Sequence, residues 1–327
     1  MRPLRLLQVI LLLALPAAAC SWLQADSPVP FNVQELLKTG HADEALRALN
    51  AEVQANPNNA AAYNQLSRVY FQLELWDPSL RMAEKSVALE PRNSMFHQWL
   101  GRAAGRKAEA SNPFTAFALA RRVHAEFERA VALDGNNTSA RADLAEYYIE
   151  APAFLGGDKN KARQQADAVA AHDQALASYM RARVEEKQGT GRAEQQYQKA
   201  IADSGDSARF WIELAYYYRR AGRLQEMEDA INRSLTAAHH EGMPQYDGAF
   251  ILLRTGRNFP QAVNMLRDYL SGENVSEDGP AFQARYLLGQ LLEKQGNRHT
   301  AADEYRASLA LASQFRPSRD ALARVSR

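Results

Sequence analysis

Apolar and small residues recur along most of the chain at helical spacing, in pairs of short segments. The pattern is clearest in residues 60–93. One face of the first segment there is formed by Tyr63, Leu66, Ser67 and Tyr70, at i, i+3, i+4 and i+7. One face of the second segment is formed by the smaller residues Ser79, Ala83, Ser86 and Val87. Pro91 ends the second segment, because the residue before a proline disfavours helical backbone. The pattern predicts two short helices that approach each other closely.

This 34-residue unit recurs through the chain. In the first segments a large residue precedes a small one at Leu66-Ser67, Leu100-Gly101, Leu144-Ala145, Leu214-Ala215 and Leu288-Gly289, with weaker copies at Met180-Arg181 and Gly248-Ala249. Successive copies lie 34, 44, 36, 34, 34 and 40 residues apart, so the period holds with insertions. The second segments carry a small residue at Ala45, Ser79, Ala162, Ala193, Ala262 and Ala301. Because a two-helix unit cannot bury its own apolar face, the units must stack on their neighbours.

These residues resemble the tetratricopeptide repeat family. We count about eight units, starting near Asp26, Ala60, Ser94, Thr138, Gln174, Ala208, Gly242 and Phe282. The resemblance implies an all-α fold, a right-handed superhelical solenoid of helix-turn-helix units whose first helices line a concave groove. We expect the solenoid to span residues 31–315 and a C-terminal capping helix to span residues 316–327.

Two units are longer than the period requires, through extra residues at 105–116 and 151–161. In the first insertion, Ser111-Asn112-Pro113 predicts a helix start. In the second, the apolar pair Phe154-Leu155 is expected to fold back on the core. Insertions in a solenoid form loops along one edge, where they carry binding or are tolerated surface turns. The sequence leaves both readings open.

The N-terminus does not share the repeat pattern. A basic start is followed by an apolar run over residues 6–15, then by Ala17-Ala18-Ala19 and the only cysteine, Cys20. This layout predicts a signal peptide over residues 1–19. It is similar to a bacterial lipoprotein signal, although Ala17 stands where leucine is more frequent.

In such a signal the cysteine is lipidated and becomes the first mature residue. We therefore expect lipidation of Cys20, a tether over residues 20–30, and a periplasmic protein held on a membrane, the outer one in preference to the inner. The alternative is ordinary cleavage, which leaves a free thiol on a soluble periplasmic protein. Either way the chain is exported and, with one cysteine, has no internal disulfide.

Charge and motifs argue against several classes of function. Removing residues 1–19 takes two arginines from the 39 basic residues and leaves 37 against 38 acidic ones, a balance that does not favour nucleic acid. Phosphate-binding loops, zinc-protease motifs and nucleophile elbows are missing from the sequence. His239-His240-Glu241 is the one clustered metal-type triplet, but adjacent helical side chains point roughly 100° apart. We predict a non-enzymatic protein without catalytic residues, metal or cofactor.

The remaining candidate is the groove. On the first helices, a stripe beside the packing stripe is expected to face inward and to combine arginine with tyrosine or amide side chains. This combination suits peptide or carboxylate recognition, because aromatic rings give broad contact and guanidinium groups give forked donors. The predicted partner-binding residues are Asn64, Arg68, Gln98, Arg102, Arg209, Tyr216, Arg219, Arg220, Tyr246 and Arg254.

We therefore predict an interaction scaffold of the bacterial cell envelope that binds a partner protein or peptide through its concave groove. By analogy with repeat lipoproteins, its context is envelope, pilus or secretion assembly. Two alternatives stay open. One is a periplasmic chaperone or carrier, and the other is an accessory subunit of an envelope enzyme that uses the inserted loops.

The lipid anchor can be tested by removing its attachment point. Cys20→Ser takes away the only thiol of the chain, so we expect the protein to move from the membrane fraction to the soluble fraction of lysed cells. Fractionation followed by immunoblotting measures this distribution. A variant that stays with the membrane as the wild type does would remove the lipid anchor from the argument.

Overall fold

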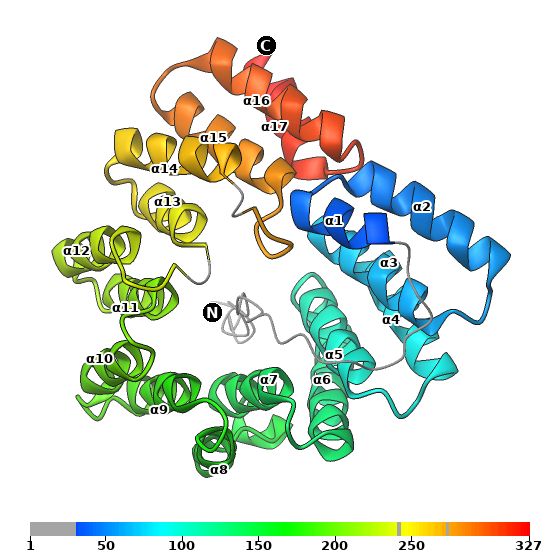
Figure 1. Ribbon diagram of the computed structural model, residues 1–327, viewed down its shortest axis with the longest axis vertical. Coiled ribbons are helices and arrows are strands. Elements are labelled where there is room, and N and C mark those ends of the chain that lie inside the picture. Colours follow the sequence, from blue (N-terminus) through cyan, green and yellow to red (C-terminus); the bar gives the residue numbers. More distant parts are fainter. Residues whose placement is uncertain (1–30, 241–242, 273–274) are drawn as a thin grey trace, which may run out of the picture. The chain divides into compact units, whose positions relative to one another are not determined.

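The computed structural model describes residues 31–240, 243–272 and 275–327. Within these ranges the chain forms seventeen α-helices, one 3-10 helix (η1) and no strand. The elements are α1 (Phe31–Thr39), α2 (Ala42–Ala55), α3 (Ala60–Gln72), α4 (Trp76–Leu89), α5 (Ser94–Glu109), α6 (Pro113–Leu133), α7 (Thr138–Glu150), η1 (Ala153–Leu155), α8 (Lys159–Val169), α9 (Gln174–Gln188), α10 (Ala193–Asp203), α11 (Ala208–Arg220), α12 (Leu224–Leu235), α13 (Pro244–Thr255), α14 (Phe259–Ser271), α15 (Ala281–Lys294), α16 (Arg298–Leu311) and α17 (Arg316–Val325). Consecutive helices pack in pairs (Figure 1), which confirms the predicted all-α solenoid of helix-turn-helix units.

The first helices of the repeats begin close to the predicted positions. Helices α3, α5, α7, α9 and α11 begin at Ala60, Ser94, Thr138, Gln174 and Ala208, and α13 and α15 begin at Pro244 and Ala281. Side-chain caps explain several of these starts. Asn93, Asn137 and Asp173 each accept a hydrogen bond from a backbone N–H in the first turn of the following helix. The unit start expected near Asp26 lies outside the described residues.

Small residues let the two helices of a pair approach closely. In the first complete pair, the Ser67 and Ser79 hydroxyl oxygens lie 3.2 Å apart, and the Ser79 hydroxyl also donates to the Ser67 carbonyl at 2.9 Å. In α5, Gly101 leaves room for the ring of Phe127, which is fully buried. Gly289 does the same for the ring of Tyr305. The large-small pairs of the sequence are therefore packing residues.

The helices divide into two compact units. Unit 1 contains residues 56–71 and 75–204, and unit 2 contains residues 205–327 together with 72–74 and the described part of the N-terminal region through residue 55. Unit 1 therefore comprises α4–α10 with most of α3. Unit 2 comprises the first helix pair, α1 and α2, together with α11–α17.

In unit 2 the first helix pair packs against the last repeats of the chain (Figure 1). The Asp43 carboxylate of α2 accepts two hydrogen bonds from the Ser313 backbone N–H, at 3.1 and 3.0 Å. Gly40 lies so close to Pro280 and Ala281 that a Cβ at that position would fall 2.6 Å from the Ala281 nitrogen. Repeat periodicity does not predict this contact, because it joins segments at opposite ends of the sequence.

Both insertions fold onto neighbouring elements of unit 1. Helix α6 is long because Asn112 caps an extra stretch, accepting hydrogen bonds from the Phe114 and Thr115 backbone N–H groups at 3.1 Å. After α7, the chain forms η1 and turns at Gly156, whose φ is +94°. Leu155 is buried as expected, but Phe154 is 70% exposed, so the prediction that both fold back on the core is wrong for Phe154. Adjacent residues of a short helical turn point in different directions, and only one of them reaches the core.

The described helices include none that is both long and apolar enough to cross a membrane. Cys20, the expected signal peptide over residues 1–19 and the tether over residues 20–30 lie outside the described residues.

The close approach at Gly101 gives a test of the packing. In Gly101→Ala the new Cβ would lie 2.4 Å from the buried Phe127 ring, so we expect a loss of about 1–3 kcal/mol in unfolding free energy. Gly105→Ala, one turn along α5, is the matched control, because its Cβ would meet only Val123, at an ordinary 3.8 Å. Urea unfolding compares the two variants, and equal stability would contradict the packing described here.

Candidate functional site

In unit 1, the predicted residues Arg68 and Arg102 stack against one aromatic ring. Each guanidinium carbon lies 5.0 Å from the centre of the Trp99 ring, at a distance typical of cation–π contacts. Phe71 meets the edge of Trp99, with ring centres 5.8 Å apart. Arg106 continues the series, 5.1 Å from the Trp76 ring. The result is a ladder of alternating cations and rings that joins α3, α4 and α5.

Gln98 and Arg102 also tie α5 to the next first helix, α7. The Gln98 amide donates to the Asp143 carboxylate at 2.7 Å, and the Arg102 Nε donates to the same carboxylate oxygen at 2.7 Å. Both side chains also donate to the Ser139 hydroxyl. Asp143 is 1% exposed. These two predicted partner-binding side chains are thus held by hydrogen bonds between repeats. The predicted Asn64 is buried on α3, and its amide nitrogen has no hydrogen-bond partner in the structure.

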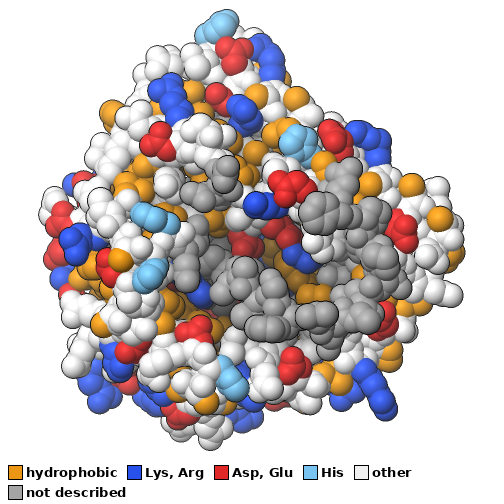
Figure 2. Space-filling model, in the orientation of Figure 1, with side chains coloured by type: hydrophobic (Ala, Val, Ile, Leu, Met, Phe, Trp, Pro, Cys, Tyr) orange, Lys and Arg blue, Asp and Glu red, His pale blue; other side chains and the backbone are white. Residues whose placement is uncertain are grey.

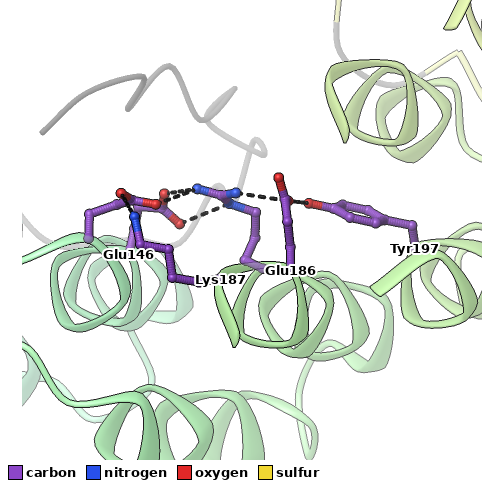
Figure 3. A network of polar contacts seen from close by, with 6 residues as sticks. Glu146, Glu186, Lys187 and Tyr197 are labelled. Atoms are coloured by element: carbon purple, nitrogen blue, oxygen red, sulfur yellow. Dashed lines mark hydrogen bonds and ion pairs between the residues drawn. The ribbon is translucent and has the colours of Figure 1, made fainter. Parts of the chain in front are cut away.

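A second polar network joins α7 to α9 (Figure 3). Arg183 of α9 forms ion pairs with Glu146 and Glu150 of α7 and with Glu186 of its own helix. Lys187 adds a bond to Glu150 at 2.7 Å, and the Tyr197 hydroxyl donates to Glu186 at 2.8 Å. Burial alone would lower the pKa of Arg183, but the Glu146 carboxylate holds that pKa well above its ordinary value. Arg183 therefore stays charged and fixes its carboxylates in place.

Between these two networks lies a pocket formed mainly by α5, α6 and α7, with about 660 Å³ of empty space including the part open to solvent. Its walls are largely apolar, and its charged lining comes from arginines of α5 and from carboxylates of α5 and α7. The lining residues are Phe71, Gly101, Arg102, Gly105, Arg106, Ala108, Glu109, Ala120, Val123, Phe127, Glu146, Tyr147, Glu150 and Ala151. The pocket thus unites the predicted Arg102 with residues of both insertions.

The pocket shifts the pKa of one carboxyl group in its lining, that of Glu109. It forms an ion pair with Arg106 at 3.2 Å. Partial burial nevertheless raises its pKa to about 8, against the opposing effect of Arg106. Glu109 therefore takes up a proton at a higher pH than an ordinary glutamate does.

In unit 2, the predicted tyrosines bridge neighbouring first helices. The Tyr216 hydroxyl of α11 donates to the Asp247 carboxylate of α13 at 3.5 Å, and the Tyr246 hydroxyl of α13 donates to the Gln283 amide oxygen of α15 at 3.2 Å. Burial raises the pKa values of both tyrosines. Arg209 is 9% exposed and lies over the Phe210 ring.

The structure brings three predicted arginines together in unit 2. Arg219 and Arg220 are in the last turn of α11, and Arg254 is in the last turn of α13. Arg219 lies over the Tyr216 ring, 5.5 Å from its centre. Burial lowers the pKa of Arg219, and the positive charges of Arg220 and Arg254 lower it further. We name Arg219, Arg220 and Arg254 the arginine cluster, because the charges of the other two act on Arg219.

Sequence reasoning missed the acidic residues that hold these faces together. In three repeats an acidic residue stands directly before the large-small pair of the first helix: Asp143, Glu213 and Asp247. Asp143 and Glu213 are buried, and Asp247 is partly buried. The sequence signal that could have identified them is an acidic residue that recurs at the same position in several repeats. Trp99 and Arg183 gave no comparable signal, because neither residue type recurs at its position in neighbouring repeats.

Acidic and basic side chains are interspersed over the face that Figure 2 displays, in keeping with the balanced charge of the chain. The described residues contain no group of three or more histidine, cysteine, aspartate or glutamate side chains placed to hold a metal ion. The part of the molecule we describe offers cations, aromatic rings and amides, together with the largely apolar pocket of unit 1.

Asp247 gives the stability of the protein a predictable pH dependence. Burial, together with the charges of Glu213 and Asp278, raises its pKa from 3.8 to about 8. The folded protein therefore keeps a proton that the unfolded chain loses above pH 3.8. Its contribution to stability is complete below about pH 4 and is lost as the pH rises to about 8, with a slope of at most about 1.4 kcal/mol per pH unit.

We expect Asp247→Asn to flatten this decline and to raise stability near pH 8, as measured by urea unfolding across the pH range. Asp268→Asn, which changes an exposed aspartate on α14, serves as the control and should keep the wild-type profile. Parallel profiles for wild type and Asp247→Asn would show that Asp247 is ionised in the folded protein.

Comparison with known proteins supports the fold. The yeast Tom70 structure aligns with 93% of this chain and 65% of its own, with a TM-score of 0.54 and 14% sequence identity. A tetratricopeptide repeat protein from Parabacteroides merdae aligns with 91% of this chain and 100% of its own, at 12% identity and a TM-score of 0.43. A thermophilic repeat protein from Thermus thermophilus aligns with 57% of this chain and 98% of its own, at 20% identity and a TM-score of 0.47. At these identities we take only the fold from the Tom70 likeness and rest no argument on the other two.

The family model described as tetratricopeptide repeat matches residues 32–88, 189–240 and 248–314, which together make up more than half of the chain. The matched ranges include the first described repeat and the repeats of unit 2. Repeat period, paired helices and family model agree: the chain belongs to the tetratricopeptide repeat family.

Proposed function

We propose that this protein is an exported, lipid-anchored scaffold of the bacterial cell envelope that captures a partner protein by binding one of its acidic segments. Family membership supports the general part of this proposal, because tetratricopeptide repeat proteins generally serve as protein–protein interaction scaffolds. The choice of an acidic segment rests on the chemistry of unit 2.

The observation that carries the proposal is the arginine cluster. Its three guanidinium groups come from two consecutive repeats, and Arg219 lies over the ring of Tyr216. Guanidinium groups bind carboxylates through paired N–H donors, and a neighbouring ring adds contact area at low entropic cost. An aspartate or glutamate side chain, or a C-terminal carboxylate, would offset the burial and the like-charge repulsion that together lower the pKa of Arg219.

The pocket of unit 1 supplies a second type of contact. Its apolar walls suit a large apolar side chain, and the charged groups of its lining suit polar atoms beside that side chain. Buried apolar anchors commonly provide most of the binding energy in protein interfaces. We therefore infer that the pocket of unit 1 accepts an apolar anchor of a partner protein.

The envelope location is a proposal from the sequence alone. It depends on the expected signal peptide over residues 1–19 and on lipidation of Cys20, with envelope, pilus or secretion assembly as the proposed setting. One observation favours a second candidate function, a periplasmic carrier. The pocket of unit 1 is lined mainly by apolar side chains with a few charged groups, as small-molecule sites commonly are. A carrier would bind apolar small molecules without needing the arginine cluster.

Cross-linking in intact cells tests the scaffold proposal. A photo-reactive amino acid at Phe250, whose ring lies under Arg254, reports on capture beside the cluster. We expect Arg219→Ala combined with Arg254→Ala to reduce the cross-linked product roughly tenfold or more, because two charge-assisted contacts are lost. Arg219→Lys with Arg254→Lys should restore part of the cross-linked product, since lysine returns the positive charge but not the paired N–H donors of a guanidinium group.

The matched control is Arg306→Ala with Arg316→Ala, which removes the same charge from exposed positions of unit 2 on α16 and α17. This control should cross-link as the wild type does. An unchanged product in the Arg219/Arg254 variant would exclude the arginine cluster as the capture site. Loss of the product in the control as well would show that net charge, and not the cluster, decides capture.

A further inference from the structure

Exposed large hydrophobic side chains gather at one place in unit 1. In the described part of the chain such side chains are Met95, Phe114, Phe117 and Phe154, and the three phenylalanines belong to the two insertions or to the helix turn that follows the first one. Phe114 is 90% exposed, Phe154 is 70% exposed and Phe117 is 45% exposed. We name these three residues the phenylalanine patch. The proposed partner-capture site uses none of them.

The patch is a built feature of the fold. Asn112 caps α6 and places Phe114 and Phe117 on one face of its first turns, at i and i+3. Phe154 comes from η1, and its ring stacks on that of Phe117, with centres 6.4 Å apart and planes inclined by 13°. Two segments separated in the sequence thus bring their rings together in the open.

The turn that carries Phe154 is tightly held. The Tyr147 hydroxyl donates to the Leu155 carbonyl at 2.7 Å, and the Asp158 backbone N–H donates to the Tyr148 carbonyl at 2.9 Å. Gly157 packs so closely that a Cβ there would lie 1.8 Å from the Ala151 carbonyl oxygen. A turn fixed in this way keeps Phe154 pointing outward, instead of letting it collapse onto the core.

Basic residues lie near the patch in the sequence, while Glu128 lies further along α6 and pairs with His124. Arg121 follows Phe117 by one turn on the same stripe of α6, and Lys159 and Lys161 follow Phe154. The nearby Asp158 uses its carboxylate to cap α8, where it accepts from the Asn160 and Lys161 backbone N–H groups. Projecting aromatic rings with a basic border are typical of proteins that lie on anionic membranes.

We propose that the phenylalanine patch docks unit 1 on the surface of an anionic phospholipid bilayer, with its rings at the boundary between headgroups and acyl chains. This contact goes beyond partner capture and rests on the proposed envelope location only for its setting.

The area of the patch favours a bilayer over another protein. Together the three rings expose about as much surface as two whole phenylalanine side chains, roughly 400 Å². A stable protein interface needs about 800 Å² from each partner, so the patch supplies about half of that area. Insertion of a few side chains into a membrane interface has no such area requirement, because lipid surrounds each ring individually.

Single-site labelling tests the proposal in the full chain. Cys20 is the only cysteine, so Cys20→Ser combined with Phe154→Cys gives one site for an environment-sensitive NBD dye. Cys20→Ser with Met95→Cys is the matched control, because Met95 is exposed in the same unit but outside the patch. The probes are vesicles of phosphatidylglycerol and phosphatidylethanolamine, and vesicles of phosphatidylcholine alone.

We expect NBD at position 154 to brighten by roughly two-fold or more with anionic vesicles and to be quenched by spin labels on the acyl chains, as for a group entering the interface. The dye at position 95 should respond little. Adding Phe114→Ser and Phe117→Ser should weaken vesicle binding reported from position 154 roughly tenfold. Circular dichroism and thermal unfolding check that this variant is folded, and Phe114→Leu with Phe117→Leu should keep most of the binding.

Three results would overturn the proposal. The first is a dye at position 154 that ignores anionic vesicles. The second is an equal response at positions 95 and 154, which would mean that the leader or the general surface adsorbs. The third is a response that needs no vesicles and grows with protein concentration, which would assign the patch to a second copy of the chain. The assay uses neither lipidated Cys20 nor a captured partner, so failure of the proposed function leaves its outcome unaffected.

Discussion

The close approach of the two helices in each repeat is the constraint on which the rest of the structure depends. Ser67 against Ser79 and Gly101 against Phe127 bring the helix axes near enough for one helix to cover the apolar face of the other. A pair made in this way still has apolar surface on its outer sides, so it is stable only beside another pair. The first helices are thereby aligned as neighbours, and their remaining faces can carry polar side chains from one repeat to the next.

Those polar faces have a structural role beside the recognition that we propose for them. Asp143, Arg183 and Asp247 link consecutive first helices, and each lies beside residues that we assign to binding. Because a buried polar group must keep its hydrogen-bond partners, these links fix the side chains around them. The two inserted segments behave differently. Residues of both help to line the pocket of unit 1, and both carry an exposed phenylalanine, so much of the distinctive chemistry of unit 1 lies where the chain departs from the repeat.

The fold could be predicted from the sequence because packing residues repeat. Leucine before a small residue, about every 34 positions, reports the same contact many times, and the starts of α3 to α11 followed from it. The binding faces could be predicted only in part, because a polar residue such as Arg102 can point at a ligand or at a neighbouring repeat, and the choice depends on Asp143, 41 residues away. Phe154 shows the same limit. Its aromatic side chain suggests burial, but the tight turn in which it lies directs that side chain outward. These details depend on how neighbouring repeats contact each other, and the repeat period alone does not predict those contacts.

The hydrogen bonds between Asp43 and Ser313 span 270 residues, in a fold whose other contacts mostly join adjacent repeats. Unit 2 is therefore assembled from the beginning and the end of the chain. A chain that emerges from its N-terminus first must leave helices α1 and α2 without their C-terminal neighbours until the last repeat has appeared. Unit 1 contains no helix from the C-terminal part of the chain, so its folding does not require the last repeats. The order of completion is thus built into the topology: the middle of the chain can fold while it is still emerging, and the first helix pair is among the last parts to find its place.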